Sequence, residues 1–384
     1  MKVAVTTLAI CVTSLLALGL VMLYSSSMVM LDKHHNEIGT RMLMMQSIWC
    51  LPAIAICIVL AAVDYEILKR LAWPAFVMAL LLAALVFVPH VGLNINGSRR
   101  WIRLPGATFQ PSEMIKIALI LVLAWQGDRS VRTMNTFVRG MIYPGMVILT
   151  AVAFVIKEPD FGTSVLLVGV GGVMLFLAGT RWWHLLPPAL LGAGGMTWYL
   201  KHDSMRGGRI AAWLHPELYP DLARQAEQAK VAIGSGGLTG LGLGDGRQKL
   251  GFLPEIHSDF IFANIGEELG LLATALLVLA FVLIAFCGIF IALRARDRFG
   301  CLLAVGVTTL ITLQALFNMY VVTSLLPNKG IALPFISAGG SSLVAMFAGV
   351  GILFSVARQA TPAKISASDF VSKSNDNPFA AKAT

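Results

Sequence analysis

Apolar runs long enough to cross a lipid bilayer recur along this chain and constrain its fold more than any other feature. Two of them are AVTTLAICVTSLLALGLVML at residues 4–23 and LLATALLVLAFVLIAFCGIFIAL at residues 271–293. A helix of about 20 apolar residues spans the hydrocarbon core, and helices satisfy their own backbone hydrogen bonds where water is absent. Only 13% of the residues are charged, about half the fraction of a typical soluble domain. The sequence predicts an all-α polytopic membrane protein.

Ten apolar spans can be delineated along the chain. They lie at about residues 5–24, 42–62, 71–89, 111–125, 138–156, 161–179, 183–200, 261–293, 300–325 and 340–357. An even number of spans puts both termini on one side. With a cytoplasmic N-terminus, nine Lys and Arg residues fall in the short inside loops and seven in the short outside loops, a narrow margin for this orientation. The prediction is one membrane domain over residues 1–357 with cytoplasmic termini.

Two regions outside the spans differ in character. Residues 201–260 form the one long loop, between the seventh and eighth spans, with a candidate amphipathic helix at DLARQAEQAKVAI. Residues 358–384 are polar and rich in small residues, so we expect a disordered cytoplasmic tail. The five cysteines lie in or beside apolar runs without C-x-x-C spacing, which favours membrane packing over a disulfide or zinc site. No internal repeat is evident, so an inverted-repeat transporter gains no support.

Four polar segments adjoin the spans and face one side of the membrane in the ten-span topology. They are residues 96–116, 157–164, 234–260 and 326–342. The first places Glu113 and Lys116 three residues apart inside an apolar helix, where they share a face and can form an ion pair. Ionisable residues inside a span are costly and indicate function by default. A purely structural ion pair is the alternative.

The long loop contains the glycine-rich run GSGGLTGLGLGDGRQK at residues 234–249. It matches neither G-x-x-x-x-G-K-[ST] nor G-x-G-x-x-G, and no strand pattern precedes it, so it is not a nucleotide-binding loop of either kind. The glycines could let backbone amides approach an anion. Tight packing at the membrane surface is the favoured interpretation for most of them.

Four carboxylates cluster in GFLPEIHSDFIFANIGEELG, at the start of the eighth span: Glu255, Asp259, Glu267 and Glu268. Asp259 could cap the helix, or act as a general base whose pKa is raised by partial desolvation. One of Glu267 and Glu268 should face the interior and pair with a cation. His257 and Glu255 could contribute to a metal site, but one histidine among scattered acids is a poor metal signal.

Several of these segments resemble the SEDS family (shape, elongation, division and sporulation). The resemblance is carried in family order by FQPSEMIKIALIL, EPDFGTS, GSGGLTGLGLGDGRQKLGFLPEIHSDFIFANIGEELG and LPNKGIALPFISAGGSS, and it covers nearly the whole chain. The NKG before IALPFIS is more similar to division members than to elongation members. The resemblance implies ten spans, a large extracytoplasmic loop between spans seven and eight, and a place in the bacterial cytoplasmic (inner) membrane, at the division septum.

The same resemblance implies a peptidoglycan glycosyltransferase that polymerises lipid II beside a class B penicillin-binding protein and other division proteins. The family's essential aspartate lies in a motif that reads HSDF here, which identifies Asp259. A carboxylate can accept the proton of the attacking sugar hydroxyl, and cations can stabilise the departing pyrophosphate. An apolar groove between spans would hold the polyprenyl tails.

The predicted site therefore has three parts. Asp259 is the candidate catalytic base. The candidate substrate-binding residues are Arg99, Arg100, Arg103, Lys249, Lys329, His257, Ser337, Gly339 and Gly340. The candidate supporting residues are Glu113, Lys116, Asp160, Glu267 and Glu268. The sequence indicates no particular cofactor, although a divalent cation is compatible with the chemistry, and no nucleic-acid partner is expected. The alternatives are a lipid II flippase and a non-catalytic cell-division scaffold.

Overall fold

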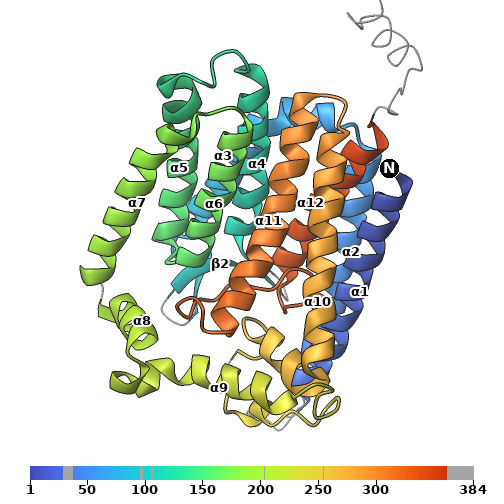
Figure 1. Cartoon of the computed structure of the whole chain (residues 1–384), viewed down its shortest axis with the longest axis vertical. Helices are drawn as coiled ribbons and strands as arrows, with labels where there is room; N and C mark the ends of the chain where they lie inside the picture. The colour runs from blue at the N-terminus through green and yellow to red at the C-terminus, as the bar shows by residue number, and fades with distance from the viewer. Residues whose placement is uncertain (29–37, 96–97, 105–106, 203, 254, 361–384) are drawn as a thin grey trace, which may run out of the picture.

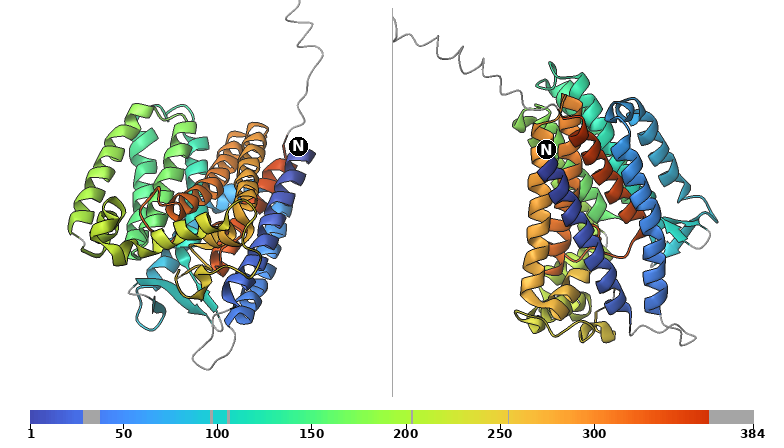
Figure 2. Two further views of the ribbon diagram at one scale, coloured as in Figure 1. Left: turned by 60° about the horizontal axis from the view of Figure 1, so that its bottom comes forward. Right: turned by 90° about the vertical axis from the view of Figure 1, so that its right-hand side faces the viewer.

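The computed structural model of the chain describes residues 1–28, 38–95, 98–104, 107–202, 204–253 and 255–360. Its long helices are α1 (Lys2–Ser27), α2 (Ile38–Ala62), α3 (Tyr65–Leu85), α4 (Pro111–Arg129), α5 (Tyr143–Lys157), α6 (Phe161–Leu177), α7 (Trp182–His202), α10 (Ile261–Leu293), α11 (Arg298–Val322) and α12 (Gly340–Arg358). The helices form one bundle, and the start of α1 and the end of α12 lie at the same end of it (Figures 1 and 2).

Each of the ten predicted spans is occupied by one of these helices. Among the described residues, seven helical segments are long and apolar enough to cross a membrane: Lys2–Ser27, Gly39–Ala62, Tyr65–Leu85, Val138–Lys157, Ile261–Leu293, Arg298–Val322 and Gly340–Arg358. Phe161–Leu177 is apolar but shorter, and α4 carries Glu113 and Lys116. A polytopic, mainly helical fold is thus confirmed, while the count of ten spans stays a prediction. The predicted tail falls largely on residues 361–384, which lie outside the described residues.

The described part of the long segment between α7 and α10 contains two further α-helices and two short 3-10 helices, Pro216–Leu218 and Gln248–Leu250. The two α-helices are α8 (Ser204–Leu214) and α9 (Pro220–Gly236), and α9 covers the stretch DLARQAEQAKVAI that was predicted to be amphipathic. Both lie at the end of the bundle opposite the start of α1 and the end of α12 (Figure 1). The side chain of Trp213 in α8 donates from Nε1 to the carbonyl of Ser324 at 2.8 Å, which ties this segment to the one after α11.

The expectation of an all-α chain is wrong for residues 92–109. Three short strands, β1 (Gly92–Ile95), β2 (Ser98–Leu104) and β3 (Ala107–Phe109), form an antiparallel sheet in the order β1-β2-β3. Leu93 pairs with Trp101 and Asn94 pairs with Arg99, so Arg100 is left as the extra residue of a bulge in β2. A bulge redirects the side chain that it carries. Antiparallel pairing provides hydrogen-bond partners for the backbone N–H and C=O groups of this polar segment, where it adjoins the membrane helices.

A break in α10 explains the glycine-rich run. Gly270 has φ 75° and ψ −171°, which interrupts the helix and frees backbone groups on either side. The loop after α9 bonds to these groups, because the amides of Leu241 and Gly242 donate to the carbonyls of Glu267 and Glu268 at 3.0 Å. Gly240 lies directly against the Glu268 carbonyl, where a side chain would collide. Close packing, the favoured interpretation of this run, fits the contacts at Gly240.

Both Glu267 and Glu268 are buried, at 1% and 0% exposure, and both bind the same loop. Glu267 accepts the backbone amide of Arg247 at 2.8 Å. Glu268 forms an ion pair of 3.0 Å with Lys249 and accepts hydrogen bonds from the hydroxyl of Ser25 and the amide of Gly244. The prediction of a buried glutamate with a cationic partner agrees with this geometry. These two carboxylates fasten the loop to α10 and α1.

Replacing Lys249 with Met should therefore destabilise the fold. The Glu268 charge would remain buried without its partner, which costs about 3–5 kcal/mol. The measurement is the unfolding free energy or melting temperature of the purified protein in detergent. The double variant Lys249→Met/Glu268→Gln removes both charges and should recover most of the loss. Equal stability of Lys249→Met and the wild type would contradict this role.

Candidate functional site

Asp259 lies in the loop that ends where α10 begins. The residue that caps α10 is Phe260, with no side-chain capping bond, so the helix-cap interpretation of Asp259 is wrong. Its side chain lies instead beside Gly330, in the segment between α11 and α12. A Cβ atom added at Gly330 would lie 2.6 Å from Oδ2 of Asp259. A side chain at position 330 would therefore require the Asp259 carboxylate to move.

Three consecutive backbone carbonyls hold the Asp259 loop in place. The carbonyl of His257 accepts the amide of Ala338 at 3.1 Å, and the carbonyl of Ser258 accepts the hydroxyl of Ser337 at 2.6 Å. The carbonyl of Asp259 accepts Nδ2 of Asn318 at 2.8 Å. The backbone that carries the carboxylate is thus bound at every residue from 257 to 259.

The surroundings of Asp259 raise its pKa to about 7. Burial is the largest cause, and the negative charges of Glu255 and Asp160 add to it. The positive charges of Arg100 and Arg209 oppose the shift. A carboxyl group with this pKa can both accept and release a proton near neutral pH, which suits a general base.

The three arginines predicted to bind substrate differ in position, although all lie on β2. Arg99 and Arg103 are exposed, whereas Arg100, the bulged residue, is half-buried. Among the described residues, the Nε atom of Arg100 is buried without a hydrogen-bond partner. The charge of Arg100 lowers the pKa of both Asp259 and Glu158. Arg100 is therefore the arginine of this strand that the structure brings to Asp259.

Lys329 precedes Gly330 and so belongs to the same surroundings. It is half-buried, and its ammonium group lies over the ring of Phe161, 5.7 Å from the ring centroid. Phe161 is the first residue of α6, directly after Asp160. Lys329, Asp160 and Asp259 therefore come from three separate segments of the chain that meet at one end of the bundle.

Asp160 fixes the start of α6 and contacts the start of α4. Its carboxylate accepts the amide of Thr163 at 3.0 Å and the hydroxyl of the same residue at 2.8 Å. Nε2 of Gln110, the residue that caps α4, lies 3.4 Å from Asp160 Oδ2. Asp160 is therefore the N-cap of α6, and its supporting role at the site stays a prediction.

Glu158 is a buried acid that the sequence interpretation did not include in the site. It is 0% exposed, and neither oxygen makes a hydrogen bond of good geometry to a described residue. Burial, the largest cause, and the charge of Asp160 raise its pKa to about 8, while the nearby Ser112 hydroxyl and the Arg100 charge oppose the shift. At neutral pH its protonated form predominates.

The predicted Glu113–Lys116 pair is present within α4. The two side chains are buried, and Lys116 Nζ lies 2.7 Å from Glu113 Oε2. The same ammonium group donates to Oε1 of Gln314 in α11 at 2.9 Å. The Glu113–Lys116 pair of α4 is thus also bonded to α11.

Several predicted substrate-binding residues make contacts within the protein. Ser337 holds the Asp259 loop, and the amide of Gly339 donates to Gln46 in α2 at 3.2 Å. Gly340 packs against the indole of Trp49. The charge of Lys249, predicted to bind pyrophosphate, is taken by Glu268 instead. These contacts give Ser337, Gly339, Gly340 and Lys249 structural roles.

His257 is half-buried beside Glu255, with Nε2 3.8 Å from Glu255 Oε2. Burial is the largest cause that lowers the pKa of His257, so its neutral form is favoured at neutral pH. Within the described part of the chain, no three His, Cys, Asp or Glu side chains are grouped so that they could hold a metal ion. The contact between His257 and Glu255 is an electrostatic one at 3.8 Å.

Four residues of this region were missed by the sequence interpretation: Glu158, Arg209, Gln314 and Asn318. Gln314 and Asn318 carry a detectable signal, because they are amides four residues apart in an apolar span. Glu158 directly precedes the PDFGTS segment. Arg209 gives no distinctive signal, since it lies among other polar residues of the long loop.

Glu158→Gln should change how stability depends on pH. The folded protein, with a pKa of about 8 against an ordinary value of 4.5, holds one more proton than the unfolded chain between these values. Wild-type stability should therefore fall as pH rises through this window, by up to about 1.4 kcal/mol per pH unit. The variant should lack this component in melting curves, whereas Glu227→Gln on exposed α9 should retain it. Parallel curves for the wild type and Glu158→Gln would contradict the prediction.

Comparisons with known proteins agree with the predicted family. The sequence matches the FtsW/RodA/SpoVE family, described as cell cycle proteins, over residues 6–362. It is 39% identical over 350 residues to the probable peptidoglycan glycosyltransferase FtsW of Trichlorobacter lovleyi, covering 91% of this chain and 92% of that protein. It is 37% identical over 348 residues to the stage V sporulation protein E of Bacillus subtilis, covering 90% and 94%.

Solved structures share the fold. A chain of a peptidoglycan synthase complex that coordinates polymerisation and crosslinking has a TM-score of 0.73 and 26% identity, with coverage of 91% of this chain and 96% of that one. The rod shape determining protein RodA of Thermus thermophilus has a TM-score of 0.66 and 27% identity, with coverage of 92% and 97%. The match over residues 6–362 and the relatives that share its length show that this chain belongs to the FtsW/RodA/SpoVE family of cell cycle proteins, the SEDS family.

Proposed function

We propose that this chain is a peptidoglycan glycosyltransferase that polymerises lipid II at the outer face of the cytoplasmic membrane, with Asp259 as general base. The observation that carries the proposal is the Asp259 carboxyl group, whose pKa is raised to about 7 and whose backbone is bound at three successive carbonyls. The names of the relatives, which include peptidoglycan glycosyltransferases, support the same activity.

The proposed reaction transfers a glycan between two lipid-linked sugars. The 4-hydroxyl of the acceptor sugar attacks the anomeric carbon of the donor and forms a new C–O bond. The bond between that carbon and the pyrophosphate oxygen breaks, and polyprenyl pyrophosphate leaves with the electron pair. Asp259 takes the hydroxyl proton, which is worth on the order of a hundred- to ten-thousand-fold in rate. Attack opposite the leaving group inverts the anomeric centre.

Cations near Asp259 are suited to the charge of the leaving group. Arg100 has a buried Nε–H without a partner among the described residues, and an arginine can bind pyrophosphate oxygens through two parallel hydrogen bonds. The charge of Arg209 acts on Asp259, and Lys329 directly precedes Gly330, which contacts the Asp259 carboxylate. We assign pyrophosphate binding to Arg100, Lys329 and Arg209. Arg99 and Arg103, which are exposed, stay candidates for substrate binding.

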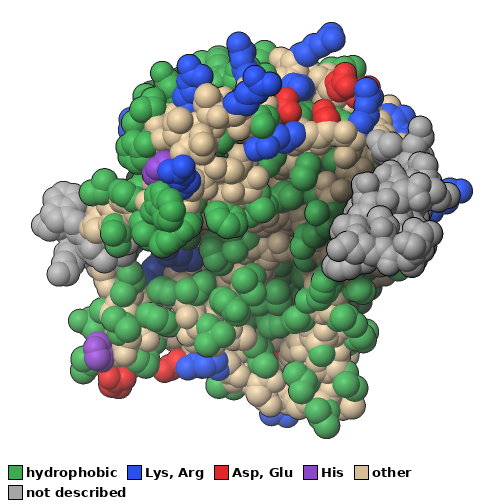
Figure 3. Space-filling model, turned by 45° about the horizontal axis from the view of Figure 1, so that its top comes forward, with side chains coloured by type: hydrophobic (Ala, Val, Ile, Leu, Met, Phe, Trp, Pro, Cys, Tyr) green, Lys and Arg blue, Asp and Glu red, His purple; other side chains and the backbone are tan. Residues whose placement is uncertain are grey.

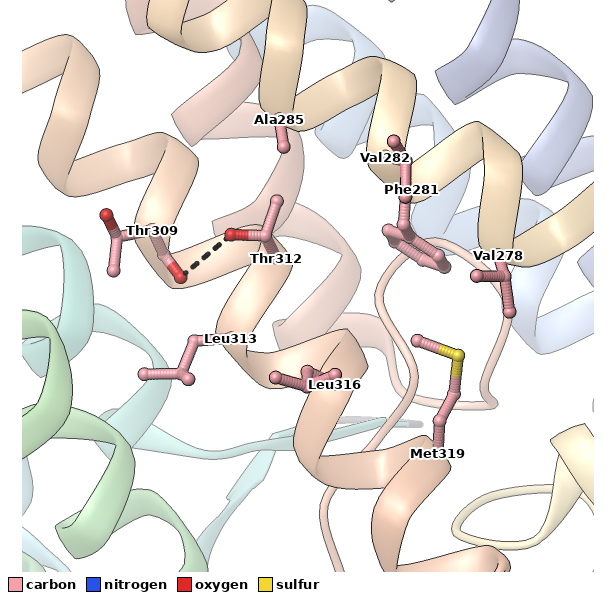
Figure 4. Close-up of a pocket in the computed structure, with 9 residues that line it drawn as sticks. All are labelled: Val278, Phe281, Val282, Ala285, Thr309, Thr312, Leu313, Leu316 and Met319. Atoms are coloured by element: carbon pink, nitrogen blue, oxygen red, sulfur yellow. Dashed lines mark hydrogen bonds between the residues drawn. The ribbon is translucent and has the colours of Figure 1, made fainter.

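The polyprenyl chain requires an apolar surface close to the base. A groove of about 270 Å³ lies between α10 and α11, lined by Val278, Phe281, Val282, Ala285, Thr309, Thr312, Leu313, Leu316 and Met319 (Figure 4). The hydroxyl of Thr312 bonds to carbonyls of its own helix, so the groove remains apolar. Met319 adjoins Asn318, the residue bonded to Asp259. We propose this groove as the binding surface for a polyprenyl tail.

The distribution of Lys and Arg between the two ends of the bundle supports an orientation in the membrane. Lys and Arg side chains gather over the end that contains the start of α1 and the end of α12 (Figure 3). Positive residues favour the cytoplasmic side, so we propose that both termini are cytoplasmic. Asp259 and the segment with α8 and α9 then face outward. The likeness to a chain of a peptidoglycan synthase complex supports a class B penicillin-binding partner, and the FtsW relatives support a role at the division septum.

Asp259→Asn should abolish glycan polymer formation. The amide keeps the size of the carboxylate but cannot accept a proton at neutral pH. The purified protein, with its co-expressed penicillin-binding partner, is given labelled lipid II and the products are separated by size. Asp245→Asn, the same change at an exposed position of the glycine-rich loop, is the matched control and should remain active.

The outcomes separate the candidate functions. Polymer from wild type and Asp245→Asn but not from folded Asp259→Asn supports the base role. Equal polymer from all three removes Asp259 from that role. No polymer from any of them, with lipid II transferred across vesicle membranes, favours the flippase, and no activity of either kind favours the scaffold.

The pH dependence of the polymerisation rate should follow the protonation of Asp259. With a pKa of about 7, its proton-accepting form falls about tenfold per pH unit at lower pH, so the rate should rise with pH and level off above the pKa. Glu255→Gln removes a charge that raises this pKa, so the rising limb should move to lower pH. Glu227→Gln should leave it in place. If the rate of Glu255→Gln rises over the same pH range as that of the wild type, the rise does not reflect the protonation of Asp259.

A further inference from the structure

Two buried amide side chains lie on one face of α11, next to the segment that contacts Asp259. Gln314 and Asn318 are four residues apart, so they project from the same side of the helix, and each is 1% exposed. Amides inside an apolar helix are retained where they bond across to other segments. Their partners indicate what these two amides do.

Gln314 connects α4 to the segment after α11. Its Oε1 accepts Nζ of Lys116 at 2.9 Å, and its Nε2 donates to the carbonyl of Ala332 at 2.9 Å. Lys116 is in turn paired with Glu113. One side chain therefore joins the buried ion pair to position 332, two residues beyond Gly330.

Asn318 connects that same segment to the base. Its Nδ2 donates to the carbonyl of Ile331 at 2.7 Å and to the carbonyl of Asp259 at 2.8 Å. An amide nitrogen has two hydrogens, so both are used by these two bonds. Asn318 holds Asp259 and residue 331 at a fixed separation, and Gly330 fills the space against the carboxylate.

We propose that Gln314 and Asn318 are positioning residues that link the Glu113–Lys116 ion pair to Asp259 and fix the carboxylate where it accepts the proton. The inference rests on the proposed function and extends it to two residues of α11. The chain of contacts runs from Glu113 through Lys116 and Gln314 to residues 330–332, and through Asn318 to Asp259. The side chains of Glu113, Lys116, Gln314 and Asn318, which form this path, are all buried.

The geometry favours a positioning role over a general contribution to stability. The amide of Asn318 bonds directly to the backbone carbonyl of the reacting residue. A displacement of about 1 Å at a catalytic group can cost on the order of a hundredfold in rate. Helix stability alone would be served equally well by leucine at these two places.

The test compares Gln314→Met and Asn318→Leu with the wild type in the lipid II polymerisation assay. Each variant keeps approximate side-chain volume and removes the hydrogen bonds. Thr308→Val is the control, because Thr308 is a buried polar residue of α11 whose hydroxyl bonds only within its own helix. We expect kcat to fall at least tenfold in both amide variants, with KM for lipid II within twofold of the wild type. Thr308→Val should retain kcat.

Melting temperature and binding of lipid II establish that each variant is folded. If Asn318→Leu does not fold, Gln314→Met decides, since it leaves Lys116 paired with Glu113. Folded variants with kcat within twofold of Thr308→Val overturn the inference, and so does a rise in KM at constant kcat. Activity that survives Asp259→Asn would instead overturn the proposed function, so the two failures are distinct.

Discussion

The hydrogen bonds to the carbonyls of residues 257 to 259 are the interaction on which the candidate site depends. Each carbonyl is bound from a different position: Ala338, Ser337 and Asn318. The loop also bonds internally, because the carbonyl of Glu255 accepts the amides of Ser258 and Asp259 at 3.1 Å. These bonds convert it into a rigid support for one carboxyl group, and they bring the segments after α7 and after α11 into one unit.

The carboxyl groups of this chain have different roles because their neighbouring residues differ. Glu268 is surrounded by donors and by the ammonium of Lys249, so it serves as an anchor. Asp160 accepts hydrogen bonds at a helix start and so stabilises an element. Asp259 is buried near the charges of Glu255 and Asp160, which raise its pKa and leave it able to take a proton. The proposed catalytic role therefore follows from burial and neighbouring negative charge.

The sequence predicted the elements well because apolar runs determine membrane helices almost alone. Ten helices occupy the ten predicted ranges, and the spacing of Glu113 and Lys116 sufficed for their ion pair. The small sheet was missed because its strands are short and polar, without a hydrophobic alternation. The ion pair of Lys249 was not predicted, because a charge in a sequence does not reveal its partner and Glu268 lies 19 positions away. Asp259 was identified from its motif, whereas the roles of Gln314 and Asn318 required knowing which backbone carbonyls face them.

The placement of Arg100 shows how the sheet contributes to the proposed chemistry. A regular strand would give its arginines alternating directions, with two of three on one side. The bulge removes Arg100 from the pairing pattern, and this residue alone among the three has a buried guanidinium nitrogen without a partner. Its charge lowers the pKa of Asp259 while Glu255 and Asp160 raise it. A pyrophosphate bound to Arg100 would offset that positive charge, so binding the donor would make Asp259 a stronger base at the moment when a base is required.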